Sequence, residues 1–293
     1  MKASDLRGIL TYIPSFRDKL FVLSVDSAVL EDERAASLFL DISVLRSLNI
    51  RVALVHGASA RIKKIATEMK VKPSDVDGLG VTDEATLRVA ERAANSYSHD
   101  ILQHLADVDL KGAVTNAVIA HPAGILGGVD HQWTGRVERV DSKFLEALLD
   151  NGILPVIPPL GVDGDGRTYR VNSDGVALEV AEALRAEKLI FLTGNGDLPK
   201  NGKKPAQLSV EEATEYLKKK KGEISQEMAS KLEHGLRACK EGVSRAHILD
   251  GREDEALLDE LFSSEGVGTM IYADEYTEIR KAMKKDVRSI MRL

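Results

Sequence analysis

The sequence contains one cysteine and no long apolar run, and both absences exclude classes of protein. Cys239 alone can form neither an internal disulfide framework nor a multi-cysteine metal site, which fits a reducing compartment. No stretch of about 18 apolar residues could span a bilayer. The short amphipathic N-terminus carries Asp5 and Arg7, unlike a secretory signal peptide. We therefore expect a cytoplasmic protein with no membrane partner.

An excess of positive charge and a set of paired metal ligands are lacking too. The chain has 40 Lys and Arg against 46 Asp and Glu, a net charge of −6, which argues against nucleic acid as the main partner. Its 7 histidines are scattered without metal-ligand spacing, so no metal site is expected. The lysine run 218–221 is interpreted as a solvated helix end.

The stretch from Gly152 to Thr193 is the most informative part of the chain. Its apolar runs 153–157 and 189–193 are typical of strands buried on both faces. Between them, Asn172 stands at the start of a helix as a cap, followed by Asp174. A strand, a polar turn, a helix and a strand form a βαβ unit, which places ligands at the carboxyl ends of its strands. Asn172 and Asp174 are therefore candidate site residues.

The rest of the chain alternates in the same way, which predicts an α/β protein with a mainly parallel sheet. Further strands are expected at 20–25, 51–55, 114–119, 168–171, 245–249 and 268–272. Helices are expected at 31–48, 61–70, 84–105, 141–150, 209–220, 226–242 and 256–262, and the helix at 209 opens with a capping box.

Three segments divide the chain. Residues 1–19 are expected to form an N-terminal helix, whose apolar stripe packs either on its own domain or against another subunit. Residues 20–273 form the α/β body. Residues 274–293 change character, with a strand-like 278–281 and then an amphipathic helix that opens at Asp286. This last segment is interpreted as the start of another domain.

Several motifs, in order and at matching spacing, resemble the amino-acid kinase family over roughly residues 10–272. They are GLGVTDEAT, GILPVIPPLGVDGDGRTYRVNSDGVA, AEKLIFLT, ISQEMASKLEHGL, HILDGR and ELFSSEGVGT. More narrowly they look like acetylglutamate kinase and the kinase-like domain of N-acetylglutamate synthase. The resemblance implies a three-layer αβα fold around a mainly parallel central sheet, plus the N-terminal helix. The tail IRKAMKKDVRSIMRL resembles the opening of a GNAT acetyltransferase domain, which implies an acetyl-CoA-dependent partner domain.

The phosphate-binding loops of these kinases are altered here. Where the family has Lys-x-Gly-Gly after the first strand, this chain has Ser24-Val25-Asp26-Ser27. The second glycine loop is Gly57-Ala58-Ser59-Ala60, and Gly80 replaces the arginine that holds the substrate carboxylate in relatives. A carboxylate at Asp26 would repel a triphosphate by several kcal/mol, roughly 4 at close range. The resemblance with these departures predicts that the domain does not transfer phosphate.

Three polar residues of the kinase pattern remain, Asn172, Asp174 and Lys231. One interpretation is a structural helix cap with a buried Asp–Lys pair. The alternative is an active acetylglutamate kinase with divergent loops, which would use ATP and Mg²⁺. Under the first interpretation this chain needs no cofactor.

The resemblance implies an arginine site near the end of the chain, as in arginine-inhibited relatives. Glu265 would pair with the guanidinium, and backbone N–H groups at Gly268 and Thr269 would bind the α-carboxylate. His247 belongs to the same matching segments, and Tyr12 on the N-terminal helix would close the site. Glu265 has a second interpretation as a solvated loop carboxylate, and His247 as a strand-end histidine satisfied by the backbone. The expected function is an arginine-sensing, oligomeric regulatory domain in arginine biosynthesis.

Overall fold

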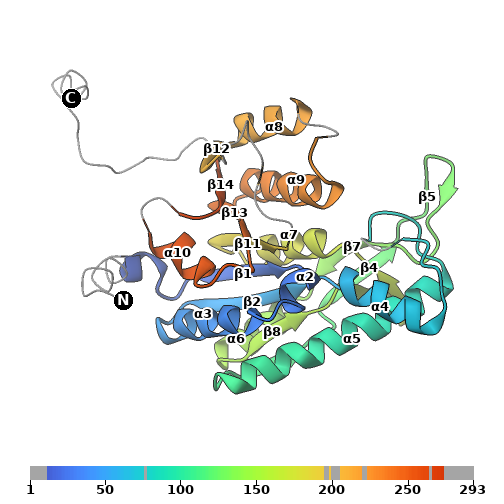
Figure 1. Ribbon diagram of the computed structural model, residues 1–293, viewed down its shortest axis with the longest axis horizontal. Coiled ribbons are helices and arrows are strands. Elements are labelled where there is room, and N and C mark those ends of the chain that lie inside the picture. The colour runs from blue at the N-terminus through green and yellow to red at the C-terminus, as the bar shows by residue number, and fades with distance from the viewer. Residues whose placement is uncertain are drawn as a thin grey trace.

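The computed structural model describes residues 12–75, 78–194, 198, 205–219, 223–263 and 266–273. A large, mostly parallel sheet runs through its centre (Figure 1). In spatial order its strands are β12 (Gln207–Ser209), β14 (Thr269–Tyr272), β13 (Arg245–Asp250), β11 (Lys188–Thr193), β1 (Leu20–Val25), β2 (Arg51–His56), β8 (Leu154–Ile157) and β3 (Gly112–Val114). The pair β13–β14 is antiparallel, and the other neighbouring pairs are parallel. The predicted mainly parallel sheet is confirmed.

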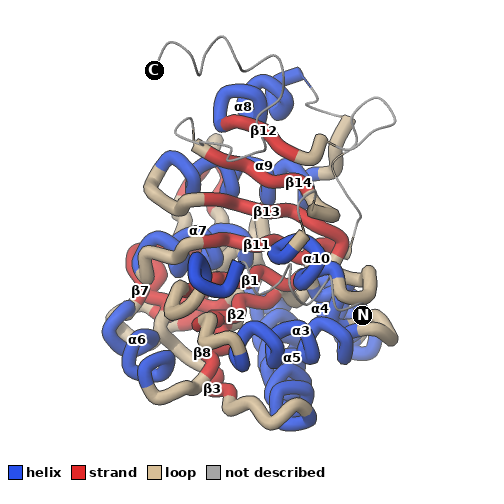
Figure 2. Tube along the Cα trace, turned by 90° about the vertical axis from the view of Figure 1, so that its left-hand side faces the viewer, coloured by secondary structure: helices blue, strands red, loops and turns tan. Residues whose placement is uncertain are grey.

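Helices cover both faces of this sheet (Figure 2). Side chains of β1 alternate between two hydrophobic clusters, with Phe21 and Leu23 in one and Val22 in the other. This two-sided burial is why the strand is a continuous apolar run. The cluster that contains Phe21 and Leu23 lies under α3 (Ala35–Ser47), α5 (Glu84–Asp107) and α10 (Ala256–Phe262). The cluster that contains Val22 lies under α6 (Ser142–Asp150), α7 (Ser173–Ala183), α8 (Val210–Lys219) and α9 (Gln226–Lys240). The three-layer αβα arrangement is thereby confirmed.

A second, smaller sheet lies beside the first. Its order is β10 (Thr168–Arg170), β9 (Leu160–Val162), β4 (Val118–Pro122) and β7 (Gly135–Val140), with a two-stranded hairpin of β5 (Ile125–Leu126) and β6 (Val129–Asp130). The prediction of one strand at 114–119 was wrong. Val114 ends β3 in the central sheet, and Val118 begins β4 in the second sheet. Only Thr115, Asn116 and Ala117 separate the two strands, and so short an interruption did not reveal the change of sheet.

The helix starts follow their capping residues. Asn172 accepts a hydrogen bond from Gly175 N–H at 2.9 Å at the start of α7. Ser209 and Glu212 bond each other's backbone N–H at 3.2 and 2.9 Å, the expected capping box. The helix expected at 31–48 begins later, because the Asp32 carboxylate accepts the Arg34 N–H at 3.0 Å and forms a turn before α3. A short α2 (Ser27–Leu30) precedes that turn.

The two edges of the parallel strands carry different structures. At the carboxyl edge, β1, β2 and β8 lead toward α2, α4 (Ser59–Met69) and α7. At the opposite edge lie α10 and the helical residues 12–16, on the left of Figure 1, whereas α4 lies on the right. Residues 1–11 and 274–293, including the expected start of another domain, lie outside the described part. Within the described part, no helix is both long and apolar enough to span a bilayer.

Candidate functional site

A cavity of about 190 Å³ lies at the carboxyl edge of the central sheet. Its wall includes the residues that directly follow β1 and β2, namely Asp26 and Gly57, and the start of α7. Parallel strand ends and helix N-termini meet here, as in other α/β ligand sites. The predicted residues that line it are Asp26, Ser27, Gly57, Ala58, Asn172, Asp174 and Lys231.

A triad of buried Lys231, buried Asp174 and half-buried Asp26 occupies one wall of this cavity. Lys231 Nζ lies 2.7 Å from Asp26 Oδ1 and 3.0 Å from Asp174 Oδ1. Ser230 Oγ donates to Asp174 Oδ2 at 2.7 Å, and Gly194 N–H donates to Asp26 Oδ2 at 3.4 Å. The Asp–Lys pair expected from the sequence is present, and Asp26, the residue after β1, joins it. The single ammonium is therefore shared by two carboxylates.

The pKa directions agree with this sharing. Burial alone would lower the pKa of Lys231, but the carboxylates of Asp174 and Asp26 outweigh burial and raise it above the ordinary value. Burial raises the pKa of Asp26, Lys231 opposes that shift, and the nearby Asp174 adds to it. Lys231 thus stays charged, and the carboxylates of Asp26 and Asp174 neutralise its charge without any ligand.

The first turn of α4 is a position at which a helix can bind phosphate, and one of its backbone N–H groups is already hydrogen-bonded to a side chain of this chain. Ser27 Oγ accepts the Ala60 N–H at 2.9 Å and lies 3.0 Å from Ser59 Oγ. The N-cap residue Ala58 supplies no side-chain cap of its own. The Ser27 hydroxyl therefore contacts a helix N-terminus at which an anion would bind.

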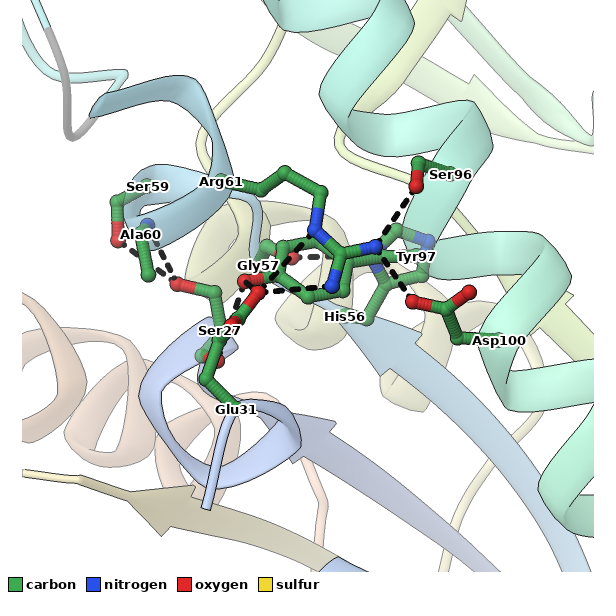
Figure 3. A network of polar contacts seen from close by, with 10 residues as sticks. All are labelled: Ser27, Glu31, His56, Gly57, Ser59, Ala60, Arg61, Ser96, Tyr97 and Asp100. Atoms are coloured by element: carbon green, nitrogen blue, oxygen red, sulfur yellow. Dashed lines mark hydrogen bonds and ion pairs between the residues drawn. The ribbon is translucent and has the colours of Figure 1, made fainter. Parts of the chain in front are cut away.

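Arg61, also in the first turn of α4, is engaged away from the cavity (Figure 3). Its guanidinium donates to Glu31 Oε1 at 2.8 Å and to Ser96 Oγ at 2.7 Å, and it pairs with Asp100. Its Cζ lies 4.0 Å from the centre of the Tyr97 ring. This network ties α4 to α5 and uses the positive charge of Arg61.

A third cation, Arg170, is held in the cavity wall. It is 4% exposed, and its Nη1 donates to the backbone oxygen of Asp75 at 2.9 Å and pairs with the Asp75 carboxylate at 3.2 Å. Gly80 lies beside the same Asp75 side chain and does not line the cavity. Ser24 is buried within β1 and does not line it either. These two predicted positions thus lie apart from the cavity surface.

The cavity is consequently poor in charge available to a triphosphate. Transfer of phosphate needs cations and N–H groups aimed at the phosphate oxygens. The cations Lys231, Arg61 and Arg170 all have carboxylate partners, while Lys63 lines the cavity from an exposed position. Within the described residues, no group of three or more His, Cys, Asp and Glu side chains could hold a metal ion. The geometry favours a structural role for the retained kinase residues.

A second polar cluster lies at the opposite edge of the sheet, where β11 and β13 begin. His247 Nδ1 lies 2.6 Å from Glu260 Oε1 on α10, and its Nε2 lies 3.0 Å from Lys188 Nζ. All three residues are buried, at 3%, 8% and 3% exposure for His247, Glu260 and Lys188. Buried titratable side chains from two strands and a helix therefore meet at this edge of the sheet.

Glu260 anchors this cluster. Its Oε2 accepts the Val267 N–H at 2.8 Å and the Gly268 N–H at 2.6 Å. Burial alone would raise the pKa of Glu260, but hydrogen bonds from His247 and these N–H groups lower it. The carboxylate is therefore ionised at neutral pH and lies next to a glycine turn.

The pKa values of His247 and Lys188 are both lowered in this cluster. Burial and the neighbouring Lys188 lower the pKa of His247 to about 4. Because an ionised carboxylate only accepts, neutral His247 donates through Nδ1 to Glu260 and accepts from Lys188 through Nε2. Burial and Arg245 lower the pKa of Lys188 to about 7, so a ligand carboxylate would favour its charged form.

Aromatic rings cover the cluster. Lys188 Nζ lies 5.2 Å from the centre of the Phe16 ring. Tyr12 stacks on Phe16 at 6.1 Å and meets Phe262 of α10 edge-on at 6.4 Å. The N-terminal helical residues and α10 thus close this edge together.

The residues expected for the arginine site fall partly here. His247 belongs to the cluster, Gly268 donates to Glu260, and Tyr12 is in the aromatic cover. Thr269 is buried nearby and its hydroxyl donates to the Pro205 oxygen at 2.7 Å. Glu265 lies outside the described residues. The interpretation of His247 as satisfied by the backbone was wrong, because its partners are side chains.

Glu260 and Lys188 were missed from the sequence. Glu260 lies in the helical run ALLDELF, between leucines that pack into the core, and Lys188 opens the strand KLIFLT. A charged residue inside an otherwise apolar buried element is the signal that could have identified both, since such charges are rarely buried without a partner.

Comparison with known proteins identifies the family of this chain. The model of the amino acid kinase family matches residues 19–250. The amino-acid acetyltransferase of Ralstonia nicotianae is 34% identical over 98% of this chain, which spans 66% of that protein, just under two thirds of its length.

Two structures of N-acetylglutamate synthase from Neisseria gonorrhoeae are also similar. One is complexed with coenzyme A and N-acetyl-glutamate; it has a TM-score of 0.86 at 30% identity, and the match covers 100% of this chain and 68% of the chain in that structure. The other is complexed with coenzyme A and L-arginine; it has a TM-score of 0.87 at 29% identity, and the match covers 100% of this chain and 70% of the chain in that structure. The chain therefore belongs to the amino acid kinase family, in the group that occurs within amino-acid acetyltransferases.

Proposed function

We propose that this chain is the regulatory domain of an N-acetylglutamate synthase, that it binds L-arginine at the Lys188–His247–Glu260 cluster, and that it does not phosphorylate. The observation that supports it best is this buried cluster, with an ionised Glu260, under an aromatic cover. In the cavity at the carboxyl edge of the sheet, Lys231 and Arg170 are paired with carboxylates of the chain. The L-arginine complex of the similar Neisseria gonorrhoeae protein supports the choice of ligand.

The chemistry of arginine matches the cluster group by group. A guanidinium pairs best with a carboxylate, and Glu260 is ionised at this place. The α-carboxylate of the ligand would pair with Lys188. The methylene stem would pack on the rings of Phe16, Tyr12 or Phe262, which now cover the charges. Two residues of the arginine site expected from the sequence, His247 and Gly268, orient Glu260 by hydrogen bonds.

Binding would be coupled to the N-terminal segment by this cover. Phe16 is 8% exposed and lies over Lys188, so an arginine that reaches Lys188 must displace it. We propose that the N-terminal helix then changes its contact with another subunit of a homo-oligomer. Such coupling requires that arginine bind the two arrangements with different affinity.

The two sites lie at opposite ends of the same strands. β11 runs from Lys188 in the cluster to Thr193, whose neighbour Gly194 donates to Asp26 at the cavity. Its six residues span roughly 20 Å. In the intact protein, which we place in the cytoplasm, a C-terminal domain would transfer acetyl from acetyl-CoA to glutamate. Residues 274–293 would begin that domain.

The alternative function is an active acetylglutamate kinase. The specific observation in its favour is that Asn172, Asp174 and Lys231 do line one cavity. The pairing of Lys231 with Asp26, however, places a carboxylate where a phosphate would approach. Kinase activity with ATP and Mg²⁺ would require that pair to break.

Calorimetric titration of L-arginine into this chain tests the proposal. We expect saturable binding of one arginine per chain, because Glu260 and Lys188 offer one carboxylate and one ammonium. L-Citrulline has nearly the same shape but no charge on its side chain, so we expect no measurable binding. The absence of heat with arginine, or equal binding of citrulline, would overturn the arginine assignment.

A further inference from the structure

Asp26, the residue after β1, does not use its side chain for the short helix that it begins. It is the N-cap residue of α2, with a φ of −63° and a ψ of 144°, yet its carboxylate makes no hydrogen bond to the start of that helix. An N-cap aspartate normally accepts from the N–H groups of the first turn. Here its oxygens contact Lys231 Nζ at 2.7 Å and the Gly194 N–H at 3.4 Å instead. The side chain is therefore directed to the cavity wall and not to α2.

Ser27, the next residue, is also directed away from its own helix. Its hydroxyl accepts a hydrogen bond from the Ala60 N–H at 2.9 Å and lies 3.0 Å from Ser59 Oγ, both in the first turn of α4 (Figure 3). The N-cap residue of α4, Ala58, has no side-chain group that could accept this bond. Two consecutive residues thus supply oxygen atoms to a buried ammonium and to a helix N-terminus, which are the two kinds of group that bind an anion.

Of the two carboxylates that share Lys231, Asp26 is the one that a ligand would meet. Asp174 is the deeper partner, with 4% of its side chain exposed, and Ser230 Oγ fixes it at 2.7 Å. The Asp26 side chain is 18% exposed and lines the cavity. Lys231 keeps its charge in this contact, and its charge opposes the protonation of Asp26 that burial favours. An anion that entered the cavity would therefore compete with Asp26 for the ammonium.

We propose that Asp26 and Ser27 act as an internal anion, which occupies the position of the cavity in which an oxyanion such as inorganic phosphate would contact Lys231 and the first turn of α4. The contact is autoinhibitory, because the chain fills its own anion position. The internal anion excludes an external one by direct competition for Lys231 and by repulsion between like charges. The proposal is independent of arginine, whose proposed site lies at the opposite edge of the sheet.

The test titrates inorganic phosphate into the full chain and into Asp26→Ala, followed by phosphorus NMR. Alanine removes the carboxylate, and the extended backbone of residue 26 allows it. We expect no measurable binding by the parent chain and binding at least about 100-fold tighter by the variant, because a like charge beside a bound anion strongly opposes binding. Phosphate should also raise the unfolding temperature of the variant and leave that of the parent chain unchanged.

Two further variants locate the bound phosphate. The double variant Asp26→Ala/Lys231→Met lacks the ammonium, so it should lose the binding that Asp26→Ala gains. Asp165→Ala removes one carboxylate from a side chain that is 74% exposed and does not line the cavity, so it should behave as the parent chain does. An equal gain of binding in Asp165→Ala would show a general effect of net charge and would overturn the proposal.

Asp26→Asn gives a second test if Asp26→Ala folds poorly. Asparagine keeps the volume and an oxygen that can accept from Lys231, but it has no charge. We expect it to bind phosphate more tightly than the parent chain and less tightly than Asp26→Ala. A variant that is folded by circular dichroism and binds no phosphate would overturn the proposal, because Asp26 would then be only a structural partner of Lys231. Binding of phosphate by the parent chain with the same affinity would overturn it as well.

Discussion

Replacement of Lys231 by methionine is expected to lower the free energy of unfolding by about 3–5 kcal/mol. Methionine fills a similar volume, so the loss is mainly one of charge. Buried Asp174 and half-buried Asp26 would remain beside each other without the ammonium that both now contact, at 3.0 and 2.7 Å. Breaking a buried pair costs far more than breaking an exposed one, because the remaining charges stay desolvated. Urea denaturation followed by circular dichroism measures the change.

Lys63→Met is the matched control. Lys63 lines the same cavity but is exposed, so its replacement should change the stability by less than about 0.5 kcal/mol. A loss below about 1 kcal/mol for Lys231→Met would contradict the account of a structural triad. It would favour an ammonium that is held only weakly by the chain and is available to a ligand.

Replacement of Glu260 by glutamine is expected to weaken arginine binding at least about 100-fold. Glutamine keeps an oxygen that can accept from Gly268 N–H, but it cannot pair with a guanidinium. The amide also cannot match the ionised acceptor that His247 now contacts at 2.6 Å. Truncation of one partner of a buried, hydrogen-bonded charge pair typically costs several kcal/mol, about 2–5. Calorimetry with L-arginine measures the effect.

Glu253→Gln removes one negative charge from an exposed position just before α10 and serves as the control. We expect it to bind arginine as the parent chain does. A thermal unfolding curve for each variant separates lost binding from lost folding. If Glu260→Gln folds and keeps the parent affinity, the arginine site is elsewhere.

The fold was largely predictable because its strands are buried on both faces. Runs such as 20–25 and 189–193 have no polar side to confuse the assignment, and caps such as Asn172 mark the helix starts. The short strands of the second sheet were not recognised as a sheet. Periodicity describes a segment and does not say which sheet the segment joins, so 114–119 was assigned to one strand rather than two.

The candidate sites were predictable only in part, for a similar reason. The retained kinase pattern suggested a pair of Asp174 and Lys231, because both residues belong to it. It could not show that Asp26, directly after β1, would share the same ammonium at 2.7 Å. At the other edge, the sequence pointed to the glycine turn near Gly268 but not to Glu260, whose carboxylate binds that turn. Contacts between distant segments decide both cases.

The central claim is that the ion triad in the cavity wall is structural and that the cavity does not bind phosphate. The release of ADP from Mg-ATP in the presence of N-acetylglutamate tests this claim most directly. The measurement uses the full chain, at a concentration at which it binds arginine. The account predicts no ADP above that of a blank, because Lys231, Arg61 and Arg170 are all paired with carboxylates of the chain. ADP formation that Lys231→Met abolishes would contradict it.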